Sequence, residues 1–144
     1  MVEKNVKFKH MKDGDKDDYL LLQEYEEKYV SLTYERIIEE LSRQGQNTME
    51  GYKITRLDHG LQSATRAYND GADIDWIVGT LLHDIGDGLA PQNHDRFSAE
   101  VIRPYVREEV TWVVEHNGIF QMIYYAHHYG CLLYTSDAAD DSPS

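Results

Sequence analysis

Three observations predict an all-α fold for this chain of 144 residues. Apolar residues recur three and four positions apart through most of the sequence, which is the period of a helix with one buried face. Asp, Asn, Ser or Thr stands ahead of most of these stretches, and these residue types cap helix N-termini. No stretch shows the alternation of apolar and polar residues that is typical of a half-buried strand.

The pattern predicts a succession of short helices joined by loops that contain glycine, asparagine or aspartate. The expected helices cover about residues 19–29, 32–45, 54–69, 76–85, 94–103, 104–116 and 119–128.

Capping and stop residues set the boundaries of the first, third and fourth helices. We expect Asp17 or Asp18 to cap the first helix and Asp73 or Asp75 the fourth, because a side-chain oxygen there accepts free N–H groups of the first turn. Gly71 ends the third helix, since glycine tolerates the backbone turn that follows a helix.

The remaining boundaries follow from similar signals. Ser31 or Thr33 can cap the second helix, and Asn93 can cap the fifth after a loop over 86–93. Pro104 separates the fifth helix from the sixth, because proline cannot continue a helix.

The composition changes at both ends of the chain. Residues 1–17 are polar and charged, so we expect a loose leader, and residues 18–130 carry the helical pattern. The segment 131–144 resembles one translated frame of a transposase adapter used for sequencing libraries. We therefore expect that segment to be non-native and the helical domain to be truncated at its C-terminal end.

Charge and cysteine content exclude several classes of protein. The formal net charge of −12 argues against nucleic acid or an anionic membrane surface as the main partner. The only cysteine is Cys131, which excludes a disulfide framework and fits a cytoplasmic location. No apolar run approaches the ~20 residues that a membrane span requires.

His83 and Asp84 form the most informative pair in the sequence. They stand in the apolar run 81–86, where an unpartnered charge is costly, so Asp84 is expected to meet a divalent metal. His59, His94 and His116 lie on other predicted helices and can supply further ligands in the core of a helical bundle.

The run Leu-His-Asp-Ile-Gly, with one earlier and two later histidines, resembles the HD-domain superfamily of metal-dependent enzymes over about residues 50–130. The resemblance implies a helical bundle with a dinuclear metal site in its core. The residues that it implies as metal ligands are His59, His83, Asp84, His94 and His116. The family pattern closes with a later aspartate, which is expected beyond the point of truncation.

The resemblance also implies a role for each side of the Asp84 carboxylate. Its two oxygens can bridge two ions, of which His59 and His83 hold one and His94 and His116 the other. Imidazole and carboxylate suit iron first, with manganese, zinc or cobalt as alternatives. Water between two such ions becomes hydroxide near neutral pH, so Asp84 is also the expected catalytic residue, and two irons can instead bind dioxygen.

Four further residues are candidates for supporting the ligands or meeting a small anionic substrate. Asp58 can orient a ligand or serve as an ordinary solvated helix residue, and Arg96 can meet a phosphate or remain on the surface. The four candidates are Asp58, Gln62, Arg96 and Gln121.

Three functions compete at this stage. Metal-dependent hydrolysis of a small phosphorylated molecule is the commonest chemistry of the superfamily and stands first. However, Asp87 occupies the position where many such members have a lysine. The alternative is a mixed-valence diiron oxygenase of the organophosphonate-oxidising type, whose Leu-Glu-His-x-Leu-Gln stretch residues 57–62 resemble. The third is a non-catalytic HD-like binding module. The truncated chain itself is expected to have little or no activity.

Overall fold

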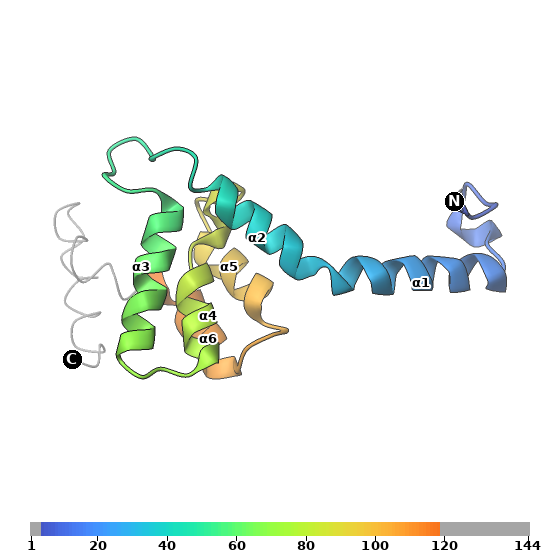
Figure 1. Ribbon diagram of the computed structural model, residues 1–144. Helices are drawn as coiled ribbons and strands as arrows, with labels where there is room; N and C mark the ends of the chain where they lie inside the picture. The colour runs from blue at the N-terminus through green and yellow to red at the C-terminus, as the bar shows by residue number, and fades with distance from the viewer. Residues whose placement is uncertain (1–3, 119–144) are drawn as a thin grey trace, which may run out of the picture. The chain divides into compact units, whose positions relative to one another are not determined.

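The computed structural model describes residues 4–118 and is helical throughout its regular structure, as the sequence predicts (Figure 1). The predicted helix over 119–128 and the segment 131–144 lie outside the described residues. The elements are η1 (Met11–Asp13), α1 (Lys16–Ser31), α2 (Thr33–Arg43), α3 (Arg56–Asn69), α4 (Ile74–Leu82), η2 (Ile85–Gly88), α5 (His94–Ile102) and α6 (Glu108–Glu115). None of these helices is both long and apolar enough to cross a membrane.

The chain divides into two compact units, one ending at Glu40 and the other beginning at Leu41. In the first unit, α1 begins earlier than the sequence predicts, and its N-cap is Asp15. Asp15 accepts the N–H of Asp18 at 2.9 Å, and Asp18 accepts the N–H of Asp15 at 3.1 Å. The expectation that Asp17 or Asp18 is the cap was therefore wrong, because Asp18 serves as the return partner of a capping box.

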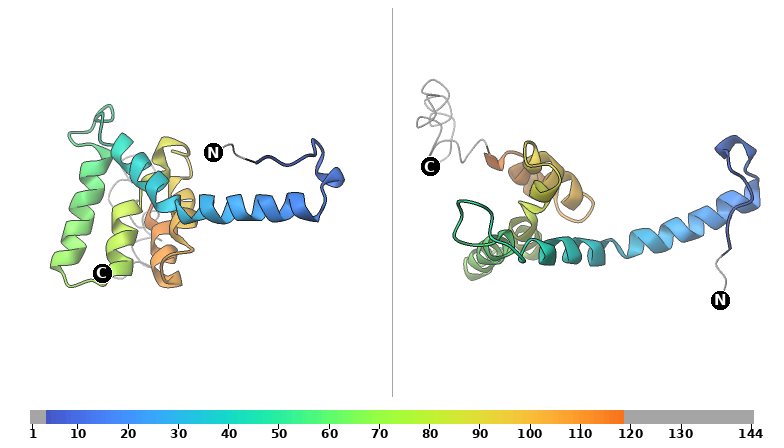
Figure 2. Two further views of the ribbon diagram at one scale, coloured as in Figure 1. Left: turned by 45° about the vertical axis from the view of Figure 1, so that its right-hand side comes forward. Right: turned by 90° about the horizontal axis from the view of Figure 1, so that it is seen from above.

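The second unit contains the helices that carry the predicted ligands. In it α3 packs against α4, α5 packs against α6 and η2, and α4 also contacts α5 and α6 (Figures 1 and 2). Its buried apolar side chains come from α4, η2, α5 and α6: Leu82, Ile85, Ala99, Ile102, Val110 and Val114. A continuous core of this kind holds the ends of these helices in fixed positions.

Helix α4 ends before His83, whereas the sequence predicts a helix to Ile85. The backbone beyond it finds other partners: Gln44 donates to the Ile85 carbonyl at 3.0 Å, and the Ser98 hydroxyl accepts the Gly86 N–H at 3.0 Å. Because side chains bond the Ile85 carbonyl and the Gly86 N–H, the backbone can leave α4 and form the short η2 helix. His83 and Asp84 consequently lie at the end of a helix.

Gly60 permits a close approach of α3 to α4. A Cβ atom at this position would lie 2.7 Å from the carbonyl oxygen of Leu81. That oxygen belongs to the backbone, so it cannot move aside as a flexible side chain would. Gly60 follows His59, and Leu81 lies two residues before His83, so the approach also sets the distance between the two histidines.

We predict that Gly60→Ala destabilises the metal-free protein by about 1–3 kcal/mol, the usual cost of overpacking. Chemical denaturation provides the measurement. The sign of the change in unfolding free energy is diagnostic, because the same substitution in a helix with open space around it stabilises the helix by roughly 0.5–1 kcal/mol. A more stable Gly60→Ala protein would show that α3 and α4 are not held together at this point.

Candidate metal centre

Three elements of the second unit bring four of the predicted ligands together. His59 lies in the first turns of α3, His83 and Asp84 follow α4, and His94 is the first residue of α5. The Asp84 side chain is only 13% exposed, so its carboxylate is largely removed from water. A buried carboxylate requires a cation or hydrogen-bond donors. The histidines around Asp84 therefore determine how its charge is balanced.

The first group of donor atoms consists of His59 Nε2, His83 Nε2 and Asp84 Oδ2. The two nitrogens lie 3.0 Å apart, and they lie 3.5 and 3.3 Å from the oxygen, respectively. Ligand atoms that share one ion at about 2.1 Å lie about 3.0–3.4 Å apart in octahedral or tetrahedral geometry. The distances of 3.0 and 3.3 Å fall within that range and the distance of 3.5 Å lies just above it, so these atoms could hold a metal ion.

The second group uses the other oxygen of the same carboxylate. Asp84 Oδ1 lies 3.3 Å from His94 Nε2, which lies 3.0 Å from Asp95 Oδ1. These three atoms also lie close enough together to hold a metal ion. Asp84 therefore directs one oxygen to each group, which is the arrangement of a carboxylate that bridges two ions.

Backbone carbonyls determine which nitrogen of two histidines faces the centre. His83 Nδ1 lies 2.6 Å from the Thr80 carbonyl, and His94 Nδ1 lies 3.1 Å from the Pro91 carbonyl. A carbonyl can only accept, so Nδ1 carries the proton in each ring. In the neutral rings Nε2 then presents a lone pair to the centre, as metal-binding histidines do.

The contacts of His94 with Asp84 and Asp95 bear on whether these three residues fit a metal ion. His94 Nε2 lies 3.3 Å from Asp84 Oδ1 and 3.0 Å from Asp95 Oδ1. Asp95 Oδ1 is buried and has no hydrogen-bond partner. Two carboxylates this close to one imidazole nitrogen need positive charge between them, and a metal ion would supply it and satisfy the buried oxygen. The residues therefore fit a metal ion.

The electrostatic environment keeps His59 in its neutral form. Burial lowers the pKa of the His59 imidazole, and the neighbouring His83 lowers it further. Asp84 acts in the opposite direction but does not reverse the shift. A neutral imidazole is the form that binds metals, so the lowered pKa of His59 favours metal binding.

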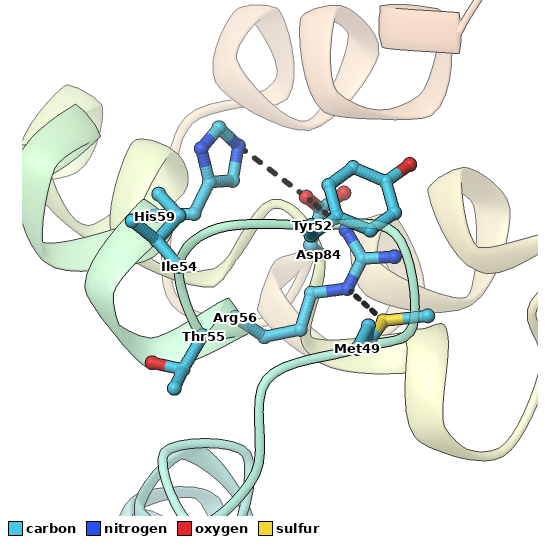
Figure 3. Close-up of a pocket in the computed structure, with 7 residues that line it drawn as sticks. All are labelled: Met49, Tyr52, Ile54, Thr55, Arg56, His59 and Asp84. Atoms are coloured by element: carbon cyan, nitrogen blue, oxygen red, sulfur yellow. Dashed lines mark hydrogen bonds and ion pairs between the residues drawn. The ribbon is translucent and has the colours of Figure 1, made fainter.

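A pocket of about 210 Å³ opens beside the first group (Figure 3). His59 and Asp84 are among its lining residues, and the others come from the loop before α3 and the first turn of α3. The lining residues are Met49, Tyr52, Ile54, Thr55, Arg56, His59 and Asp84. A small molecule in this pocket would lie next to any ion held by His59 and Asp84.

Arg56 places a guanidinium at the same oxygen that faces the two histidines. Its Nη1 lies 3.5 Å from Asp84 Oδ2, and its Nη2 lies 2.9 Å from Asp87 Oδ2. Its Nε donates to Met49 Sδ at 2.9 Å, as Figure 3 shows. The guanidinium is thus held mainly by Asp87 and only loosely by Asp84.

The structure does not bring His116 into either group. Its Nδ1 donates to the Trp112 carbonyl at 2.7 Å, and its ring stacks on the Trp112 ring at 4.3 Å. In the part of the chain that the structure describes, Asp95 occupies the place expected for His116 in the second group.

The three candidate supporting residues that the structure describes do not join either group of donor atoms. Asp58 is exposed and forms a capping box with Thr55, which explains its position through the helix start. Gln62 is exposed and lines neither pocket beside His59. Arg96 is exposed and lies near Glu100, whose pKa it helps to lower. Gln121 lies outside the described residues.

Sequence reasoning missed two features of the centre. Asp95 directly follows His94 at the second residue of α5, where an acidic residue is common whether or not it binds a metal. The pairing of Arg56 with Asp87 joins residues thirty-one positions apart. A lone arginine in an acidic chain gives no signal of such a pairing.

One curated relative gives a finding that bears on this site. The chain is 31% identical over 86 residues to a [1-hydroxy-2-(trimethylamino)ethyl]phosphonate dioxygenase (glycine-betaine-forming) of Leisingera caerulea. The match covers 52% of this chain and 44% of that protein, so the chain spans less than half of its relative's length. No protein-family model matches the chain.

We predict that Asp84→Asn lowers metal affinity more than about 100-fold, beyond the range for losing an outer hydrogen-bond partner. The amide has the shape of the carboxylate but not its charge, so both groups lose their shared ligand. Metal content after dialysis and calorimetric titration with Mn²⁺ provide the measurement. Asp58→Asn is the matched control, since it removes the same charge from an exposed cap. Two metals per chain in Asp84→Asn would refute the bridging assignment.

Proposed function

We propose that this chain carries the metal centre of an HD-superfamily diiron oxygenase that acts on a small organophosphonate. The observation that carries the proposal is the Asp84 carboxylate, whose two oxygens face two separate groups of donor atoms. Similarity to a phosphonate dioxygenase supports this function over phosphohydrolysis, which the sequence alone placed first.

Two sets of residues would hold the metal ions. His59, His83 and one oxygen of Asp84 would hold the first ion. The other oxygen of Asp84, His94 and Asp95 would hold the second. When bound, a pair of irons would pass electrons from the substrate carbon to dioxygen.

The chain's own residues would orient the centre and the substrate. The Thr80 and Pro91 carbonyls fix the rings of His83 and His94, so both present Nε2 to the ions without reorganisation. Apolar side chains of Met49, Tyr52 and Ile54 line the adjoining pocket and would reduce the water around a bound substrate.

The same pocket weighs against phosphohydrolysis. No lysine is present among its lining residues that the structure describes. Asp87, which takes the lysine position of many superfamily hydrolases, binds Arg56 instead. Phosphohydrolysis and a non-catalytic binding module remain the alternatives that experiment must separate from oxygenation.

We take a small anionic phosphonate as the substrate class. If this chain converts the phosphonate in its relative's name, the product glycine betaine would contain all the carbon and nitrogen of the substrate. One molecule of dioxygen then balances the equation with inorganic phosphate as the second product. The carbon–phosphorus bond breaks, the carbon is oxidised and dioxygen is reduced, with its oxygen atoms retained in the products.

We predict that the chain, purified without oxygen and supplied with ferrous iron, binds two irons that Mössbauer spectroscopy detects as a coupled pair. Addition of the phosphonate should change the iron spectrum, and oxygen should then yield glycine betaine. His94→Gln should retain one iron, since it leaves the first group intact. A chain that binds no iron pair, or that with Mn²⁺ hydrolyses a phosphate ester without oxygen, would contradict the proposal.

A further inference from the structure

We infer that Arg56 is an anion-binding residue that becomes available when metal binds to Asp84. In the metal-free protein its guanidinium is shared between Asp84 and Asp87. A metal ion bound to Asp84 would displace its contact with Arg56. The N–H groups of Arg56 that are released would then bind the anionic end of the substrate. This inference rests on the proposed function for the presence of metal at Asp84.

The two contacts of the guanidinium are unequal. Nη2 and Asp87 Oδ2 lie 2.9 Å apart, which is the distance of a charge-assisted hydrogen bond. Nη1 and Asp84 Oδ2 lie 3.5 Å apart, which is a weaker contact. All three side chains are at most 20% exposed, so solvent screens these charges poorly. Asp87 is therefore the anchor and Asp84 the exchangeable partner.

Metal and guanidinium compete for one atom. Asp84 Oδ2 is the oxygen that faces His59 and His83, and it is also the oxygen nearest Arg56 Nη1. A divalent ion at this oxygen would satisfy its charge and repel the guanidinium. Because Asp87 retains Nη2, the guanidinium stays at the site and Nη1 loses its partner beside the pocket.

The pocket is suited to what the released group would bind. Arg56 is the only cationic side chain among the lining residues that the structure describes. Figure 3 shows its guanidinium beside the Asp84 carboxylate, with Tyr52 and Met49 on the same side of the pocket. The planar fork of a guanidinium can donate two parallel hydrogen bonds to phosphonate oxygens.

Charge then imposes an order on binding. The cluster contains the carboxylates of Asp84, Asp87 and Asp95, and the Arg56 guanidinium pairs with the first two of them. An anion approaching the metal-free site would meet net negative charge, whereas divalent ions reverse the local sign. The phosphonate should therefore bind only after the metal.

The test compares two affinities in the full chain by calorimetry, with Mn²⁺ as the metal probe and methylphosphonate as the anion. Arg56→Gln should bind Mn²⁺ more tightly, because a competitor for Asp84 is gone. Its Mn²⁺-loaded form should bind methylphosphonate about 10-fold to 100-fold more weakly, the usual loss for a hydrogen bond to a charged group. Metal-free wild type should bind no methylphosphonate.

The controls separate this role from general electrostatics and from structural damage. Arg66→Gln removes the same charge from an exposed position on the same helix, and both affinities should stay near wild type. Arg56→Lys keeps the charge but loses the fork, so it should bind methylphosphonate more weakly while still competing with Mn²⁺. It also serves as the second variant should Arg56→Gln fold poorly.

Each outcome decides between the two proposals. Opposite changes in the two affinities support the role of Arg56, whereas a merely structural role would lower both. If wild type and Arg56→Gln bind methylphosphonate equally in the Mn²⁺-loaded form, the inference fails and the proposed metal centre stands. If the wild-type chain binds no Mn²⁺, both fail together.

Discussion

The second unit depends on one constraint, which is the placement of the Asp84 carboxylate away from water. Its two oxygens face His59 and His83 on one side and His94 on the other, with Arg56 near the first oxygen. The 3.5 Å contact with the guanidinium offsets only part of the cost of burying this charge. A cation at the centre would therefore stabilise the second unit further, and the donors are already held in place for one.

Packing of the helices supplies the precision that such a centre needs. Gly60 allows α3 to approach the backbone of α4 closely enough for the rings of His59 and His83 to meet. The end of α4 at Leu82 leaves Asp84 outside the regular helix, where both of its oxygens can reach partners. Since interiors pack as densely as crystals, a shift of one helix would move a whole group of donors at once.

Local patterns predicted most of the described helices and most of the candidate ligands, but they gave no information on side-chain direction. The cap Asp73 and the start of α5 at His94 agree with the prediction, whereas Asn93 makes no capping hydrogen bond and α6 begins at Glu108, later than predicted. His83–Asp84 stood out because charge is rare in an apolar run. His116 has the right type, but its hydrogen bond to the Trp112 carbonyl turns its ring along its own helix. Asp95 and Arg56 act through partners that only the tertiary fold brings near.

Asp95 links the centre to the packing of α5 against the end of α6. Its Oδ2 accepts the N–H of Gly118 at 2.7 Å, while its Oδ1 is buried beside His94 without a hydrogen-bond partner. One oxygen is thus committed to the fold and the other to the second group of donors. A metal ion that satisfies Oδ1 removes the cost of burying it, so metal binding should also stabilise the contact between these two helices. Metal affinity and the stability of this part of the second unit are consequently two measures of the same interaction.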